Sequence, residues 1–319
     1  MTSSSSERYL VVTSALANLR RKPLEALARN THDDLQETQL VRNEVLLLRE
    51  EHKDWLYVEA IEQRKYTEER GWHGYPGWVS RHHCVAVDKV ASYDAVVRAK
   101  VGRLLSHPAT TAPPHAMLLP GVRLSALERG EPYTKVGMHD GTIGWVRNEE
   151  LAFRAEVGRG SAWLREKVVE SAKLFVGTPY LWGGRSMPMA GLSGIAAGVD
   201  CSGLTNLAFR TNHVNLPRDA RDQWRVTAVV APDRLEPADL IFVSRERQPE
   251  DITHVMLYVG KSRFIEAAET GTSVKVSSFT SKFGLNLWQI AGRNSTVKEK
   301  KVYFGRIKRL EGPVPEHED

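Results

Sequence analysis

Two Gly-Trp-Val triplets place the strongest constraint on what the N-terminal half of this 319-residue chain can fold into. They begin at Gly77 and Gly144, 67 residues apart, and each follows a short β-prone run, at 55–58 and at 133–136. The second run is separated from its triplet by Asp140-Gly141, a dipeptide typical of hairpin turns. Short strands that recur with frequent turn signals predict two small β-barrels in tandem.

Composition excludes several classes of protein. The two cysteines, Cys84 and Cys201, are too few for a disulfide framework or a four-cysteine zinc module. The 44 basic and 39 acidic residues leave a net charge of +5, a mild excess that does not indicate a nucleic-acid partner. We see no signal peptide and no apolar run long enough to span a membrane, so we expect a cytoplasmic protein without membrane insertion, with export without a leader as the alternative. Nothing in the sequence indicates the oligomeric state.

The pattern changes after Gly160. Apolar residues recur at helical spacing from Trp163 to Val176, and Ser161 is the predicted N-cap of this helix. A second helix-like segment leads from Cys201 to Arg210, and strand-like runs follow at 239–243, 254–259 and 264–267. Helices followed by strands predict an α+β domain. We therefore divide the chain into disordered ends, two barrels and this third domain, with boundaries at 1–7, 8–88, 89–158, 159–310 and 311–319.

Cys201 is the candidate nucleophile. Asp200 or Ser202 is suited to cap the helix that starts there, which places Cys201 in its first turn. The helix dipole and the free backbone N–H groups of that turn favour a thiolate and can hold an oxyanion. A lone cysteine is usually a buried, inert residue, but polar neighbours and a glycine are unlike a core position.

A cysteine nucleophile needs an imidazole that is distant in sequence and close in space. His254 lies 53 residues after Cys201 and opens an alternating run in which Met256 and Tyr258 share its strand face. Glu266 follows 12 residues later, and a hairpin between the two runs would let its carboxylate orient the imidazole. A structural histidine and a solvated carboxylate are the alternatives.

The cluster of His82, His83 and Cys84 does not indicate a metal site. Consecutive strand residues point to opposite faces, so these side chains are poorly placed to share one ion. No phosphate-binding or dinucleotide fingerprint occurs either, and we predict no metal and no cofactor.

Five motifs in the C-terminal half together resemble the NlpC family of papain-like cysteine peptidases. They read Thr-Pro-Tyr-Leu-Trp-Gly-Gly at 178–184, Asp-Cys-Ser-Gly-Leu at 200–204, Leu-Pro-Arg-Asp at 216–219, Pro-Ala-Asp-Leu-Ile-Phe at 237–242 and His-Val-Met-Leu-Tyr-Val-Gly at 254–260. The two N-terminal units resemble bacterial SH3 (SH3b) domains. The run Tyr-Pro-Gly-Trp-Val at 75–79 is similar to the corresponding run in the subgroup that has two SH3b domains before the peptidase. Members of that subgroup cleave the γ-D-glutamyl–diamino acid bond of cell-wall peptides with a free N-terminal L-Ala.

The resemblance implies a role for each catalytic candidate. Cys201 is the expected nucleophile, and His254 the general base and acid. Glu266 occupies the third position, where the family most often has a second histidine, and a carboxylate there would raise the pKa of the imidazole. Tyr180 would place its phenol near the sulfur and assist the oxyanion.

The resemblance also implies a set of substrate-binding residues. Asp200 and Ser202, which flank the cysteine, would hold the free amine of the substrate, and Tyr75 of the first barrel would close that pocket. Trp182 is expected mainly to pack, and is kept as a candidate substrate contact. The stretch 186–199 is longer than is usual in the family, and we expect it to form a loop at the rim of the substrate cleft.

The predicted function is hydrolysis of murein stem peptides, with the choice between lysine and diaminopimelate left open. A non-catalytic protein that binds wall peptides through its SH3b domains is the main alternative. Acyl transfer or amide hydrolysis of a lipid on the same scaffold is another, but we find no interfacial helix for it. The presence of both Cys201 and His254 favours the peptidase.

Overall fold

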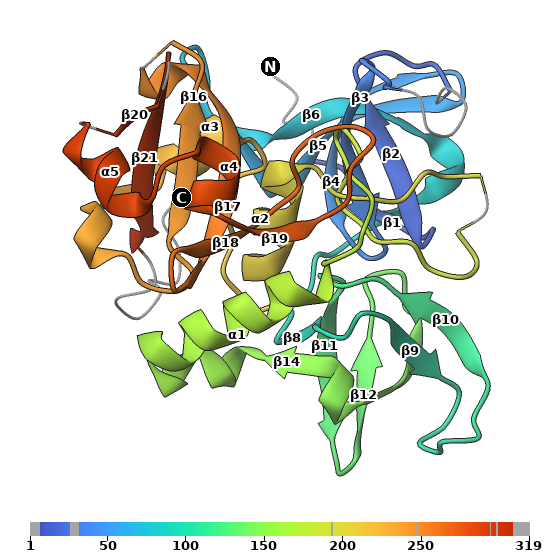
Figure 1. Ribbon diagram of the computed structural model, residues 1–319. Helices are drawn as coiled ribbons and strands as arrows, with labels where there is room; N and C mark the ends of the chain where they lie inside the picture. Colours follow the sequence, from blue (N-terminus) through green and yellow to red (C-terminus); the bar gives the residue numbers. More distant parts are fainter. Residues whose placement is uncertain are drawn as a thin grey trace. The chain divides into compact units, whose positions relative to one another are not determined.

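The computed structural model describes residues 7–25, 32–192, 194–246, 248–293, 295–297 and 299–308 (Figure 1). The chain forms two compact units: residues 1–153 with 182–197, and residues 154–181 with 198–319. The ends predicted to be disordered, 1–7 and 311–319, lie outside the described residues except for Glu7. Among the helices of the described residues, none is long and apolar enough to cross a membrane.

The N-terminal unit contains two seven-stranded sheets with one strand order. The first runs β3-β2-β6-β5-β4-β1-β7 and the second β10-β9-β13-β12-β11-β8-β14, which is the same order with every label raised by seven. The predicted tandem repeat of β units is therefore confirmed. The strands of the first sheet are β1 (Tyr9–Val12), β2 (Leu16–Arg20), β3 (Gln36–Val41), β4 (Val45–His52), β5 (Trp55–Thr67), β6 (Gly71–Ser80) and β7 (Cys84–Val87). Those of the second are β8 (Ala95–Val97), β9 (Gly102–Leu105), β10 (Pro114–Leu118), β11 (Arg123–Arg129), β12 (Tyr133–Gly137), β13 (Ile143–Arg147) and β14 (Leu151–Phe153).

The glycine of each Gly-Trp-Val triplet lies where two strands approach closely. A Cβ on Gly77 would lie 2.7 Å from Cγ of Leu19 on β2, and one on Gly144 would lie 2.7 Å from Leu104 on β9. In both sheets the following tryptophan pairs with that same neighbouring strand. The triplet recurs because each barrel needs a residue without a side chain at this strand crossing.

Residues 182–197 belong to the N-terminal unit although both flanking segments belong to the other. Their anchor is Arg185, which is fully buried and forms an ion pair with Glu44 at 2.9 Å. Ser186 donates to Gln39 Oε1 at 2.7 Å, and Gln39 Nε2 donates to the carbonyl of Ala196 at 2.7 Å. These bonds hold most of the long stretch between the Gly-Gly and Asp-Cys motifs, whose place at a cleft rim stays a prediction.

The second unit has the predicted α+β architecture, with a third seven-stranded sheet. Its order is β15-β21-β16-β17-β18-β19, and β20 pairs with β21. Each of the three sheets falls within one predicted domain segment. The strands are β15 (Thr227–Val229), β16 (Leu240–Ser244), β17 (Ile252–Gly260), β18 (Arg263–Glu266), β19 (Lys275–Ser278), β20 (Thr296–Val297) and β21 (Lys300–Ile307). The helices are α1 (Ser161–Leu174), α2 (Cys201–Arg210), α3 (Ala220–Arg225), α4 (Phe279–Phe283) and α5 (Leu287–Gly292).

The predicted cap of the first helix is wrong. Ser161 is the first helical residue of α1, and Gly160 takes the N-cap position with a φ of 100°. That backbone angle lies in the region that glycine adopts without a steric penalty, so the chain turns into the helix one residue earlier than a serine cap would allow.

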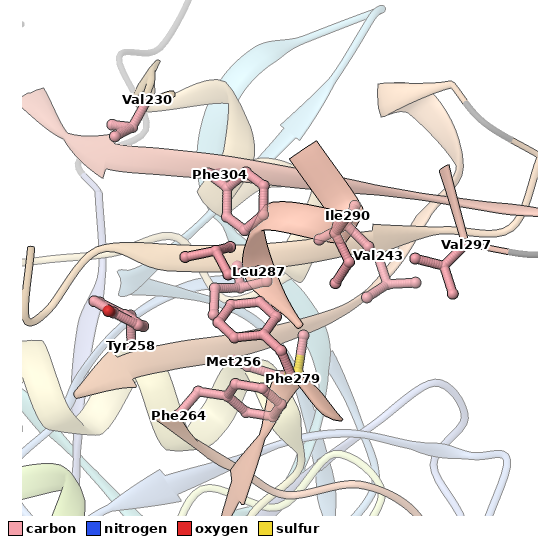
Figure 2. Packing of buried hydrophobic residues seen from close by; sticks show 12 residues of the cluster. Val230, Val243, Met256, Tyr258, Phe264, Phe279, Leu287, Ile290, Val297 and Phe304 are labelled. Carbon is pink, nitrogen blue, oxygen red and sulfur yellow. The ribbon is translucent and has the colours of Figure 1, made fainter. Parts of the chain in front are cut away.

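A cluster of twelve buried residues holds α4 and α5 against the sheet (Figure 2). Alternate residues of the strands contribute to it, among them Met256 and Tyr258 of β17, which confirms their predicted shared face. Phe279 of α4 packs edge-on against Phe264 of β18, with ring centroids 5.3 Å apart. The cluster thus fixes α4 beside the end of β18.

We predict that Gly144→Ala destabilises the protein by about 1–3 kcal/mol, because the new methyl group would overlap Leu104 and the carbonyl of Leu105. Gly158→Ala is the matched control, since a Cβ there meets nothing within 4 Å. Urea unfolding of both variants measures the difference. Equal midpoints for the two would contradict the proposed role of the triplet glycine.

Candidate active site

Cys201 is the first residue of α2, as the sequence predicts. Asp200 occupies the N-cap position, and its Oδ1 accepts a hydrogen bond of 2.6 Å from the backbone N–H of Gly203. The Cys201 residue is half-buried. Its sulfur therefore lies at the positive end of a capped helix, among backbone N–H groups that have no partner within the helix.

Arg218 holds both residues that flank the cysteine. Its Nη2 donates to Asp200 Oδ2 at 2.7 Å, and its Nη1 donates to Asp200 Oδ1 at 3.1 Å and to Ser202 Oγ at 2.9 Å. All three residues are buried. Arg218 is the arginine of the Leu-Pro-Arg-Asp motif, and its role was not predicted from the sequence. Its charge, within a motif already recognised, was the signal that could have identified it. Its partner, Asp200, lies 18 residues earlier in the chain.

His254 links the cysteine to Glu266. Its Nε2 lies 3.4 Å from Glu266 Oε2, and its side chain also forms a hydrogen bond with Cys201. Since Nε2 faces the carboxylate, Nδ1 is the nitrogen available to the sulfur. Burial lowers the pKa of His254, but the hydrogen bonds with Cys201 and Glu266 outweigh it, so the pKa is raised. The imidazolium form is therefore favoured beside the sulfur.

Glu266 is a buried carboxylate with three donors. Its Oε1 accepts from Ser277 Oγ at 2.7 Å, while Oε2 faces His254 and is contacted by the ammonium of Lys282. Burial raises the pKa of Glu266, but the hydrogen bonds from His254 and Lys282 prevail and bring it to about 2. The carboxylate is thus ionised at neutral pH. Lys282 was not predicted from the sequence, because it lies in helix α4, which strand β19 separates from β18.

Tyr180 lies in the same unit as Cys201 and interacts with it electrostatically. Its backbone forms a bridge with Val199, two residues before the cysteine, and Gly198 approaches so closely that a Cβ would lie 2.5 Å from the carbonyl oxygen of Pro179. Burial and then the charge of Cys201 raise the pKa of the phenol. Tyr180 therefore keeps its proton at neutral pH and can donate it in a hydrogen bond.

Two predicted substrate contacts belong to the other unit. Tyr75 lies buried on β6 and donates to Glu37 Oε2 at 3.3 Å, with Lys65 Nζ 4.2 Å from its ring centroid. Trp182 is 45% exposed, so it is not the packing residue that we expect from the sequence, and the ring centroid of His32 lies 5.4 Å from its own. Contact of Tyr75 and Trp182 with a substrate stays a prediction.

The C-terminal half of the chain matches a known protein family. Residues 177–292 match the NlpC/P60 family, so this part of the chain carries an NlpC/P60 domain. The gamma-D-glutamyl-L-lysine dipeptidyl-peptidase of Bacillus subtilis (strain 168) is 29% identical over 78% of this chain and 77% of its own length. Dipeptidyl-peptidase 6 of Lysinibacillus sphaericus is 28% identical over 84% of this chain and 90% of its own. The resemblance stated from the motifs is confirmed.

A solved structure shares the fold of nearly the whole chain. An NlpC/P60 family protein from Bacillus cereus ATCC 10987 superposes with a TM-score of 0.70 at 18% identity, and the match covers 94% of this chain and 99% of that one. The fold class predicted from the sequence is therefore confirmed for both halves.

We predict that iodoacetamide at pH 6 modifies Cys201 and leaves Cys84 unmodified. Burial raises the pKa of Cys84 to about 12, whereas Cys201 lies beside His254 and the N-terminal amides of α2. Peptide mass spectrometry of the labelled protein distinguishes the two. His254→Ala should slow labelling of Cys201 by about tenfold or more, and unchanged labelling in that variant would contradict the proposed pair.

We predict that Arg218→Met lowers the free energy of unfolding by about 3–5 kcal/mol, because it leaves the buried Asp200 carboxylate without its cation. Arg234→Met is the matched control, since the ion pair of Arg234 with Asp233 is exposed and long, at 3.9 Å, and should change stability by less than about 1 kcal/mol. Denaturant titration measures both. A loss for Arg218→Met no larger than the control would show that the pair does not hold the start of α2.

Proposed function

We propose that this protein is a cysteine peptidase that hydrolyses the γ-D-glutamyl–diamino acid bond of short peptidoglycan stem peptides with a free N-terminal L-Ala. The observation that carries the proposal is the single imidazole, His254, placed between Cys201 and the ionised Glu266. Two similar proteins support the choice of substrate, since they match most of this chain: one is named a gamma-D-glutamyl-L-lysine dipeptidyl-peptidase and the other dipeptidyl-peptidase 6.

The acylation step uses three groups of the site. The Cys201 thiolate attacks the γ-carbonyl carbon of D-glutamate, a C–S bond forms, and the carbonyl oxygen becomes an oxyanion. Backbone N–H groups at the start of α2 and the phenol of Tyr180 donate hydrogen bonds to that oxygen. The imidazolium of His254 gives its proton to the departing amine as the C–N bond breaks.

Deacylation returns the site to its starting state. Neutral His254 takes a proton from a water molecule, which attacks the thioester and releases L-Ala–D-Glu. The thiolate leaves, and the proton stays on His254. Glu266 holds the ring in one orientation through both steps and stabilises its charged form, because its carboxylate faces Nε2.

Recognition of the free amine is assigned to Asp200 and Ser202. Within the described residues, Asp200 Oδ1 accepts three hydrogen bonds and Oδ2 accepts one, from Arg218, so Oδ2 retains a lone pair for an ammonium group. An acetylated or cross-linked N-terminus carries no charge to pair with this buried carboxylate. Substrates with a blocked amine should therefore be discriminated against strongly.

The location in the cell is a further part of the proposal. A requirement for a free N-terminal L-Ala suits peptides already cut from the wall, and so supports a role in recycling them in the cytoplasm. Cell fractionation with an antibody against the protein tests this. Enrichment in the wall fraction or the culture medium would count against it.

We predict that the purified protein releases L-Ala–D-Glu from L-alanyl-γ-D-glutamyl-diaminopimelate, and cuts the N-acetylated peptide much more slowly. Cys201→Ala should abolish the release and His254→Ala should reduce it greatly, because each removes a reacting group. Cys84→Ala and His115→Ala are the matched controls, since neither residue belongs to the site. Mass spectrometry of the products measures the outcome, and the lysine peptide assayed in parallel decides the preferred diamino acid.

Two results would count against different parts of the proposal. Equal cleavage of free and acetylated peptides would show that Asp200 and Ser202 do not hold the amine. Binding of the peptide without release of L-Ala–D-Glu, unchanged in Cys201→Ala, would favour the non-catalytic binding protein.

A further inference from the structure

Lys282 contacts the same carboxylate oxygen that faces the catalytic imidazole. Its ammonium binds Glu266 Oε2, and His254 Nε2 lies 3.4 Å from that oxygen. The Lys282 side chain is 24% exposed, whereas that of Glu266 is 2% exposed. Within the part of the chain that the structure describes, Lys282 is therefore the one cation besides the imidazole that reaches this carboxylate, and it comes from a helix that takes no other part in the site.

The short helix α4 is held in place without Lys282. Ser278 caps it through a reciprocal pair of hydrogen bonds with Ser281, and Gly284 ends it with a φ of 69°. Phe279 packs in the core cluster against the ring of Phe264 (Figure 2), and Phe283 packs against the same cluster. Packing and capping therefore fix the helix, and the ammonium adds charge at a defined place.

The charges around His254 alternate in sign. Cys201 of α2 and Glu266 of β18 favour its charged form, and Lys282 of α4 opposes it. Ser277 of β19 adds a neutral hydrogen bond to Glu266, and Tyr180 faces Cys201 as a neutral phenol. Without Lys282, a thiolate and a carboxylate would surround a single imidazolium, which would then hold its proton too tightly to release it to a leaving amine.

We propose that Lys282 is a positioning residue of this active site, which holds the Glu266 carboxylate against His254 and lets the imidazolium give up its proton during the reaction. A carboxylate as third member of the triad introduces a buried negative charge that a neutral histidine would not, and Lys282 compensates it. This inference rests on the proposed function, but its main test needs no substrate.

The first test follows the alkylation of Cys201 by iodoacetate as a function of pH. The rate falls at alkaline pH when His254 loses its proton. Lys282→Met should move this fall to higher pH by about one unit, because a cation that opposes protonation of His254 is removed. Lys282→Arg, which keeps the charge, and Lys173→Met, which removes an exposed lysine of α1, should leave it in place.

A purely structural role gives a different result. In that case Lys282→Met would lower the melting temperature or the overall rate and leave the pH of the alkaline fall unchanged, and this outcome would overturn the inference. Failure of the peptide assay together with the predicted shift would instead refute the proposed substrate and leave the role of Lys282 intact.

The second test removes the carboxylate first. In Glu266→Gln, Lys282 becomes an uncompensated cation near the imidazole, so the double variant Glu266→Gln/Lys282→Met should alkylate Cys201 at pH 6 several-fold faster than Glu266→Gln alone. In the wild-type background, Lys282→Met should instead reduce peptide hydrolysis. Equal or slower alkylation in the double variant would overturn the inference, and this comparison holds even if the single Lys282→Met variant fails to fold.

Discussion

Two buried carboxylates, Asp200 and Glu266, lie on either side of Cys201 and His254, and each forms an ion pair with a basic side chain. Asp200 caps the helix that presents Cys201 and is neutralised by Arg218. Glu266 Oε2 lies 3.4 Å from His254 Nε2 and forms an ion pair with Lys282. A buried carboxylate is tolerated only when its charge and lone pairs are met by such partners. The positions of Cys201 and His254 therefore depend on two neighbouring ion pairs, Asp200 with Arg218 and Glu266 with Lys282.

Much of the proposed active site follows from the sequence alone. The residues Asp-Cys-Ser-Gly predict a capped helix start, and the 12-residue interval from His254 to Glu266 predicts a hairpin that joins them. Both depend on local rules, namely helix capping and strand alternation. Lys282 and Arg218 were not predicted because tertiary packing sets their partners, across strand β19 for Lys282 and across helix α2 and the segment after it for Arg218. The prediction of Ser161 as the N-cap of α1 was wrong because the preceding residue, Gly160, occupies the N-cap position.

The tandem barrels show the same division between local and long-range information. The interval between the Gly-Trp-Val triplets predicts the repeat, and the identical strand orders confirm it. The reason for each glycine, a close approach to a leucine on a distant strand, is visible only in three dimensions. Likewise, a stretch rich in glycine, alanine and methionine is typical of a loop, and nothing local reveals that Arg185 pairs with a glutamate 141 residues earlier.

The buried ion pair of Arg185 with Glu44 limits how this protein can have been assembled in evolution. The chain that joins the Tyr180 motif to the Cys201 motif takes its support from the first barrel, so the peptidase sequence is interrupted by a segment that another barrel would not accept. A gene fusion that replaced this barrel by another would leave the buried Arg185 guanidinium without the carboxylate of Glu44. We therefore expect the first barrel and the peptidase domain to have been inherited together, without exchange of either domain between related proteins.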